Sequence, residues 1–118
     1  MIEFEVIPDS NIIEFSVDGK TTKDDLGELL AACEKLITER GKIRLLKWVK
    51  SVGGVEPSAL WDNLKFGFSN FRNIERIAGV ADKEWMVKLG EIGGKLMPGE
   101  LKMFSPDQID EARAWLRE

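Results

Sequence analysis

The segment KIRLLKWV, residues 42–49, is a mostly apolar run with the length of a β-strand. Gly53 and Gly54 follow it and break the chain, and Pro57 then opens a helix predicted over residues 58–71. Strands that are separated by helices in this way pair in parallel through right-handed crossovers. This segment therefore predicts an α/β fold.

The residues before this segment predict a β-hairpin and a long helix. Residues 2–6 and 13–17 alternate apolar side chains with Glu or Ser, and turn-forming residues lie between them. Thr22 is a good cap for a helix that runs to about Arg40 and stops at Gly41. The hairpin adds antiparallel pairing to the predicted sheet.

Cys33 is the single cysteine of the chain and falls within the apolar stripe of that helix. Leu29, Leu30, Leu36 and Ile37 lie on the same stripe. A cysteine in such a place is more often a small buried hydrophobe than a redox or nucleophilic group. We expect a buried and chemically silent thiol.

The residues after the glycine loop predict two further strands, each followed by a helix. The strands cover residues 75–81 and 101–104. Asp82 caps the third helix, and a capping box over residues 105–108 opens the final helix, which starts at Pro106 and runs almost to the last residue.

The complete order of predicted elements is ββαβαβαβα. The 118 residues contain no linker, repeat or low-complexity tract, so we expect one domain over residues 1–118. Its predicted fold is α/β: a mixed, mostly parallel five-stranded sheet with an N-terminal β-hairpin, covered by four helices.

Composition excludes several classes of enzyme. The chain has no His and one Cys, which removes Ser-His-Asp and Cys-His arrangements, imidazole ligands, internal disulfides and multi-cysteine zinc sites. Paired carboxylates such as Asp24-Asp25 fall in first turns of helices, where they stabilise the helix dipole. We therefore expect a protein that is not an enzyme and that uses no metal and no cofactor.

The net charge and the lengths of the apolar runs limit which partners and which cellular location we expect. The net charge is −4 and the basic residues are spread among the acids, which argues against binding to nucleic acid. No basic leader segment and no apolar run of about 20 residues is present. We expect a cytoplasmic protein that is not an integral membrane protein.

Several motifs carry a resemblance to a known family over nearly the whole chain. They are KIRLL at 42–46, Gly54, Pro57, ALWDNLKFG at 59–67, ERIAGV at 75–80, PGE at 98–100 and AWLR at 114–117. The chain resembles the SpoIIAA-like family, which is grouped with STAS domains, and its architecture is similar to that of Sec14-type lipid-binding domains. The resemblance implies a STAS-like fold and two classes of function, a protein-interaction switch or a lipid carrier.

The phosphorylated Ser of anti-sigma-factor antagonists stands at the start of the second helix beside an Asp. The corresponding loop here, residues 50–58, offers Ser51 and Ser58 with no Asp beside either, and Val55 replaces the aromatic residue common in the family. Ser58 is the stronger candidate for phosphorylation, because a helix N-terminus favours a phosphate. A Ser in that place is also a common helix-start residue.

The same loop is a candidate ligand-binding site. Gly53 and Gly54 open a helix near Lys47 and Lys50, an arrangement that could hold an anion at the carboxyl edge of the sheet. The spacing matches neither a P-loop nor a dinucleotide fingerprint, and a tight crossover loop needs glycine for its conformation alone.

The second helix is a candidate contact surface. Its core face is formed by apolar residues at helical spacing, whereas Phe66 points to the opposite side together with Asp62. Phe66 is therefore exposed, covered by a loop, or part of a surface for a protein partner or for self-association. STAS proteins use this helix and its preceding loop for partner contact, which favours the last interpretation.

The third helix concentrates large apolar side chains, Trp85, Met86 and Leu89 among them. Such residues can line a cavity for an apolar small molecule, or they can pack on the sheet as in any crossover helix. From these observations we expect a non-enzymatic regulatory or protein-interaction module acting through the loop and the start of the second helix. The alternative is a small apolar-ligand or lipid carrier.

Overall fold

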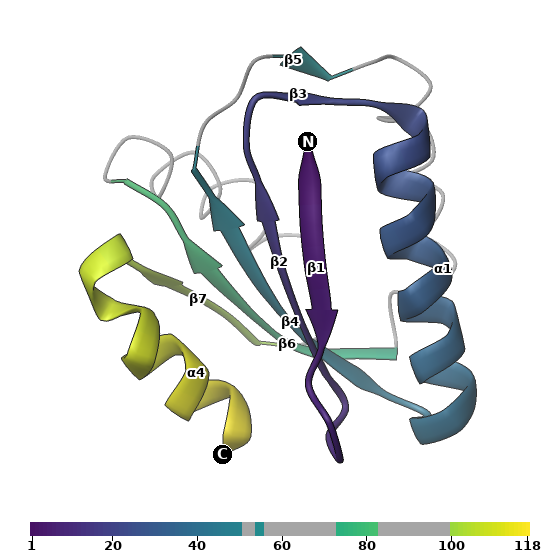
Figure 1. The fold of residues 1–118 in the computed structure, drawn as a ribbon. Coiled ribbons are helices and arrows are strands. Elements are labelled where there is room, and N and C mark those ends of the chain that lie inside the picture. Colours follow the sequence, from purple (N-terminus) through teal and green to yellow (C-terminus); the bar gives the residue numbers. More distant parts are fainter. Residues whose placement is uncertain (51–53, 56–72, 83–99) are drawn as a thin grey trace.

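The computed structural model describes residues 1–50, 54–55, 73–82 and 100–118, which form a layered α/β fold (Figure 1). The strands are β1 (Ile2–Val6), β2 (Ile12–Val17), β3 (Lys20–Thr21), β4 (Ile43–Val49), β5 (Gly54–Val55), β6 (Ile74–Val80) and β7 (Glu100–Phe104). The helices are α1 (Lys23–Arg40), the 3₁₀ turn η2 (Pro106–Gln108) and α4 (Ile109–Arg117).

The main sheet has five strands in the order β1-β2-β4-β6-β7. β1 pairs antiparallel with β2, and the pairs β2-β4, β4-β6 and β6-β7 are parallel. The α/β class, the five strands and the N-terminal hairpin predicted from the sequence are confirmed. The sheet is mixed rather than mostly parallel, because the hairpin turns β1 against the direction of its neighbours.

Three details differ from the prediction. The described residues contain two α-helices instead of four, and the helices expected over residues 58–71 and from Asp82 lie almost wholly outside those residues. β3 and β5 form a second, two-stranded parallel sheet that was not predicted, since a two-residue pairing has no hydropathy period. The closing helix begins with a 3₁₀ turn at Pro106, and its α-helical part starts only at Ile109.

Helix α1 covers one face of the sheet with the apolar stripe predicted for it. Thr22 and Asp25 form a reciprocal capping box at its start, and Gly41 ends it with a φ of 85°, a left-handed conformation that glycine adopts without strain. The core on this face consists of Leu26, Leu29, Cys33 and Leu36 from α1 with Ile13, Ile43, Leu45 and Ile74. The predicted burial of Cys33 is confirmed.

Helix α4 packs on the opposite face (Figure 1). Ala112 and Leu116 are fully buried there in a second core with Ile12, Leu46, Ala78, Val80 and Phe104. Arg44 on β4 donates from Nη1 to the carbonyl oxygen of Leu116 at 2.6 Å, and Arg76 on β6 donates to that of Trp115 at 2.8 Å. These carbonyls belong to the last turn, where the regular intrahelical donors run out. The Trp115 oxygen also accepts from the Glu118 N–H at 3.2 Å, and the two strand arginines add donors at this end of the helix.

Candidate functional site

A groove runs between the β1–β2 hairpin and α4. Helix α4 packs over β4, β6 and β7. Among the described residues, no helix packs over the β1–β2 half of the same sheet face. The resulting groove has a volume of about 300 Å³ and is here called the strand–helix groove. Its lining residues are Glu3, Phe4, Glu5, Glu14, Phe15, Ser16, Leu46, Trp48, Lys50, Ile109 and Arg113.

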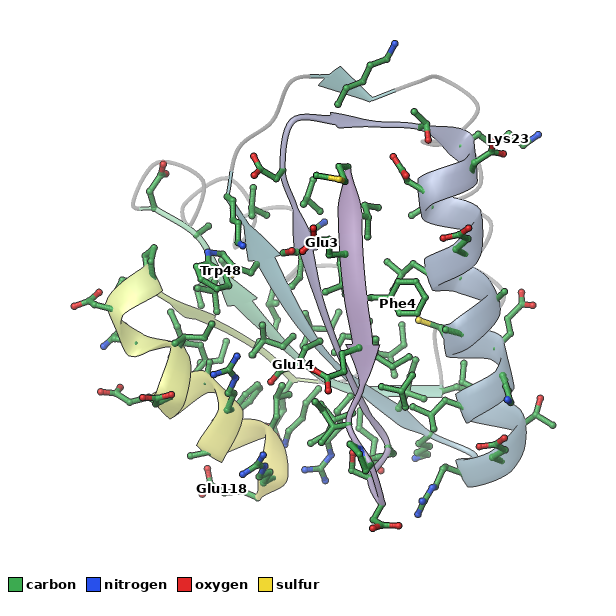
Figure 2. The ribbon with its side chains drawn as sticks, viewed as in Figure 1. Glu3, Phe4, Glu14, Lys23, Trp48 and Glu118 are labelled. Atoms are coloured by element: carbon green, nitrogen blue, oxygen red, sulfur yellow. The ribbon has the colours of Figure 1, made fainter. Side chains whose placement is uncertain are left out.

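Strand alternation places three carboxylates along the hairpin side of the groove. Glu3 lies opposite Ser16 and Glu5 lies opposite Glu14 in the β1–β2 register, so all four side chains leave the same face of the sheet. Figure 2 shows Glu3 and Glu14 on the side toward α4, whereas Phe4 points toward α1. The hairpin therefore has an acidic face and an apolar face.

Only one of these carboxylates is neutralised by a direct contact. Arg113 of α4 donates from Nε to Oε1 of Glu14 at 2.9 Å and from Nη2 to Oε2 at 3.3 Å. This hydrogen bonding raises the pKa of the Arg113 guanidinium, and the charge of Glu5 raises it further. Glu3 and Glu5 are exposed and form no hydrogen bond or ion pair with a residue that the structure describes.

Trp48 supplies the aromatic part of the groove. Its indole is half-buried on β4, and the Lys50 Nζ lies 4.5 Å from the centroid of its ring, a cation–π contact. Figure 2 shows Trp48 between β4 and α4 on the same side of the sheet as Glu3. The groove thus combines a half-buried aromatic ring with carboxylates that have no described partner, and its described lining residues include no nucleophile arranged with a base.

Lys47 and Lys50 do not converge as the anion-site interpretation expected. Lys47 alternates with Leu46 and Trp48, so it leaves β4 on the α1 face, between Phe15 and Gly79 in the register. Burial lowers the pKa of Lys47, because a desolvated ammonium is costly. Lys50 lies on the other face, over Trp48, so the two ammonium groups lie on opposite sides of the sheet.

The glycine loop is only partly described. Gly54 and Val55 form β5, which pairs with Lys20 and Thr21 of β3, so the second glycine takes part in a strand pairing. The other residues singled out from the sequence lie outside the described residues. They are Ser51, Gly53 and Ser58 of the loop, Asp62 and Phe66 of the second helix, and Trp85, Met86 and Leu89 of the third helix.

The described residues hold no metal-binding cluster and no membrane-spanning helix. No cluster of three or more His, Cys, Asp or Glu side chains suited to a metal ion occurs in residues 1–50, 54–55, 73–82 and 100–118. Over the same part of the chain, no helix has the length and apolar character that crossing a membrane requires.

The groove itself was missed by the sequence analysis. The alternation of Glu3 and Glu5 with apolar residues was recognised, but it was read only as evidence for a half-buried strand. Whether the acidic face is covered depends on where α4 docks, and the amphipathic pattern of α4 does not encode its docking position. The Glu14–Arg113 pair joins residues 99 positions apart, so no local signal reveals it.

The described residues define a small α/β domain with a mixed sheet, helices on both of its faces and a groove beside its hairpin. The SpoIIAA-like family model matches residues 12–117. The chain therefore belongs to the SpoIIAA-like family, which confirms the resemblance seen in its motifs.

A solved structure supports the same assignment. The crystal structure of an uncharacterized protein from Shewanella loihica PV-4, described as having a SpoIIAA-like fold, matches with a TM-score of 0.78 and 26% sequence identity. The match covers 98% of this chain and 92% of that one. No curated protein matches the chain.

Proposed function

We propose that this chain is a non-enzymatic, cytoplasmic protein-interaction module that binds a partner protein in the strand–helix groove. One observation supports the proposal: no described helix covers the β1–β2 half of the α4 face, and two carboxylates without a described partner and a half-buried tryptophan line the groove there. A half-buried aromatic beside exposed charges is typical of the centre and rim of a protein interface. Membership of a family related to interaction switches is consistent with this role.

The loop and second helix singled out from the sequence are proposed to serve the same interaction function. Residues 53–58, with Ser58 as a phosphorylated switch, and the second helix with Asp62 and Phe66 form a second proposed contact. Self-association through that helix is one form of it. The carrier alternative, with an apolar ligand near Trp85, stays a prediction that no described residue supports.

Site-specific photo-crosslinking in cells tests the proposal. A benzoylphenylalanine placed at Lys50 reports on the groove, and one at Phe66 reports on the second helix. Lys35 is the matched control, because it is an exposed lysine on α1, outside the groove lining. Adducts are identified by mass spectrometry, and capture is repeated with Trp48→Ala as an unlabelled background substitution.

We expect one discrete protein adduct from position 50 that is absent from position 35 and weakened by Trp48→Ala. An adduct from position 66 alone would move the contact to the second helix and overturn the groove as the binding site. Equal adducts from positions 50 and 35, or none from 50 and 66, would overturn the interaction function.

A further inference from the structure

Strand β1 is an edge of the five-stranded sheet. It pairs with β2 on one side, and no described strand pairs with it on the other. Phe4 and Val6 on this strand are 38% and 39% exposed, and they are among the most exposed large apolar residues of the described chain. An edge strand with bare backbone groups and exposed apolar side chains is a template for an added strand.

The two faces of β1 specify what an added strand carries. Residues opposite each other in neighbouring strands have Cβ atoms about 4.5–5.5 Å apart and share a face of the sheet. On the groove face, an added strand meets the free carboxylates of Glu3 and Glu5, and on the other face it meets Phe4 and Val6. A strand that alternates basic with apolar residues fits both faces.

A second copy of this chain is a poor partner for the β1 edge. Antiparallel pairing of two β1 strands centred on Phe4 places Glu3 of each copy opposite Glu5 of the other. Like charges directly opposite each other are destabilising, so these glutamates act against self-pairing at this edge. The net charge of −4 further favours approach of a cationic partner.

We infer that β1 accepts an added strand from a partner protein, namely an extended segment in which Lys or Arg alternates with apolar residues. The inference rests on the proposed interaction function and names the chemistry of its partner. Main-chain hydrogen bonds along β1 provide the attachment, and Glu3 and Glu5 select the basic side chains. The opposite groove wall carries Arg113 and Lys50, which confines the basic side chains to the β1 side.

The probe is a fluorescein-labelled seven-residue peptide that alternates Lys and Val, with capped ends. Binding is measured by fluorescence anisotropy, and amide shifts are measured by NMR. Two control peptides are used: one with the same residues in blocks, four Lys followed by three Val, and one alternating Glu and Val. A third peptide keeps the alternating sequence with every backbone nitrogen methylated, which retains its charges and removes its hydrogen-bond donors.

We expect the alternating basic peptide to bind, with the largest shifts at the β1 amides and with affinity that falls as salt rises. The double variant Glu3→Gln/Glu5→Gln should weaken binding about 3- to 10-fold, since each exposed charge pair contributes modestly. The matched control Glu28→Gln/Glu39→Gln removes two exposed carboxylates from α1 and should leave the affinity unchanged. The methylated, blocked and acidic peptides should not bind.

Four results would overturn the inference. Binding of the methylated peptide as tightly as its parent would show attraction of charge without strand addition. Equal weakening by the α1 control would show a non-specific effect of net charge. A concentration-dependent dimer with protected β1 amides would show that a second copy occupies the edge. If the peptide fails to bind while the crosslink from position 50 persists, the strand-addition mode is refuted and the interaction function stands.

Discussion

Replacing Arg113 by Met removes the guanidinium that joins α4 to β2 across the strand–helix groove. Both of its contacts with Glu14 are charge-assisted hydrogen bonds, at 2.9 and 3.3 Å. Arg113 is 41% exposed and Glu14 is 18% exposed, so water screens the attraction between them. We expect a coupling energy of about 1 kcal/mol, near the upper end for exposed pairs. Arg113→Met alone should cost about 1–2 kcal/mol, because it leaves a mostly buried carboxylate without its partner.

A double-mutant cycle measures this coupling. Urea unfolding followed by tryptophan fluorescence is carried out on the wild type, Arg113→Met, Glu14→Gln and the double variant. The coupling should shrink in 1 M salt, where the Debye length is about 3 Å. Arg117→Met is the matched control, since Arg117 is exposed in the last turn of α4 and should change stability by less than about 0.5 kcal/mol. If the two single effects add to within about 0.3 kcal/mol, the pair does not hold α4 to the hairpin and the reasoning fails.

Three further predictions concern the α1 face of the sheet. Burial raises the pKa of the Cys33 thiol to about 12, against an ordinary value of 9.0. The stability that the protonated, buried thiol contributes is therefore complete below pH 9 and is lost as the pH rises toward 12. Urea melts across this range should show less decline for Cys33→Ala, and rapid thiol labelling of the native protein would contradict the burial. Burial lowers the pKa of Lys47 below its ordinary value of 10.5, so the charged ammonium destabilises the native state at neutral pH. Lys47→Met should therefore raise the free energy of unfolding at pH 7. This gain should vanish above pH 10.5, where the lysine is neutral in the unfolded chain as well. A loss of stability in Lys47→Met at pH 7 would refute this sign. A Cβ at Gly79 would lie 2.6 Å from the Met103 Sδ. Gly79→Ala should therefore lower the free energy of unfolding by about 1 kcal/mol in thermal or urea melts, and by less in a Met103→Ala background. An equal loss in both backgrounds would show that the Met103 sulfur is not the obstacle.

Much of the fold followed from local signals. Thr22 as a cap, Gly41 as a stop and the 18-residue helix between them were predicted within one residue, because capping and glycine conformation are local properties. The strands of the main sheet were placed with similar accuracy, since each carries its own apolar pattern. The pairing of β3 with β5 was not predicted, because it joins residues about 34 positions apart with no periodicity of their own.

The candidate site was less accessible from the sequence. Lys47 and Lys50 were grouped because they are near each other in the chain, but the pleat separates them onto opposite faces. Trp48, between them, was treated as part of a strand, and its role on the groove floor depends on the position of α4. Docking between distant elements fixes such sites, and a single sequence does not report that docking.

The two arginines that bind the end of α4 also make this helix dependent on strands from distant parts of the chain. Arg44 and Leu116 are 72 positions apart, and Arg76 and Trp115 are 39 positions apart. A helix of nine residues is not stable in isolation, where about 12–15 residues are the usual minimum. The stability of α4 therefore depends on β4 and β6, which hold both guanidinium groups at its last turn. We expect the helix and the central strands to unfold together, since the helix is too short to persist without the sheet.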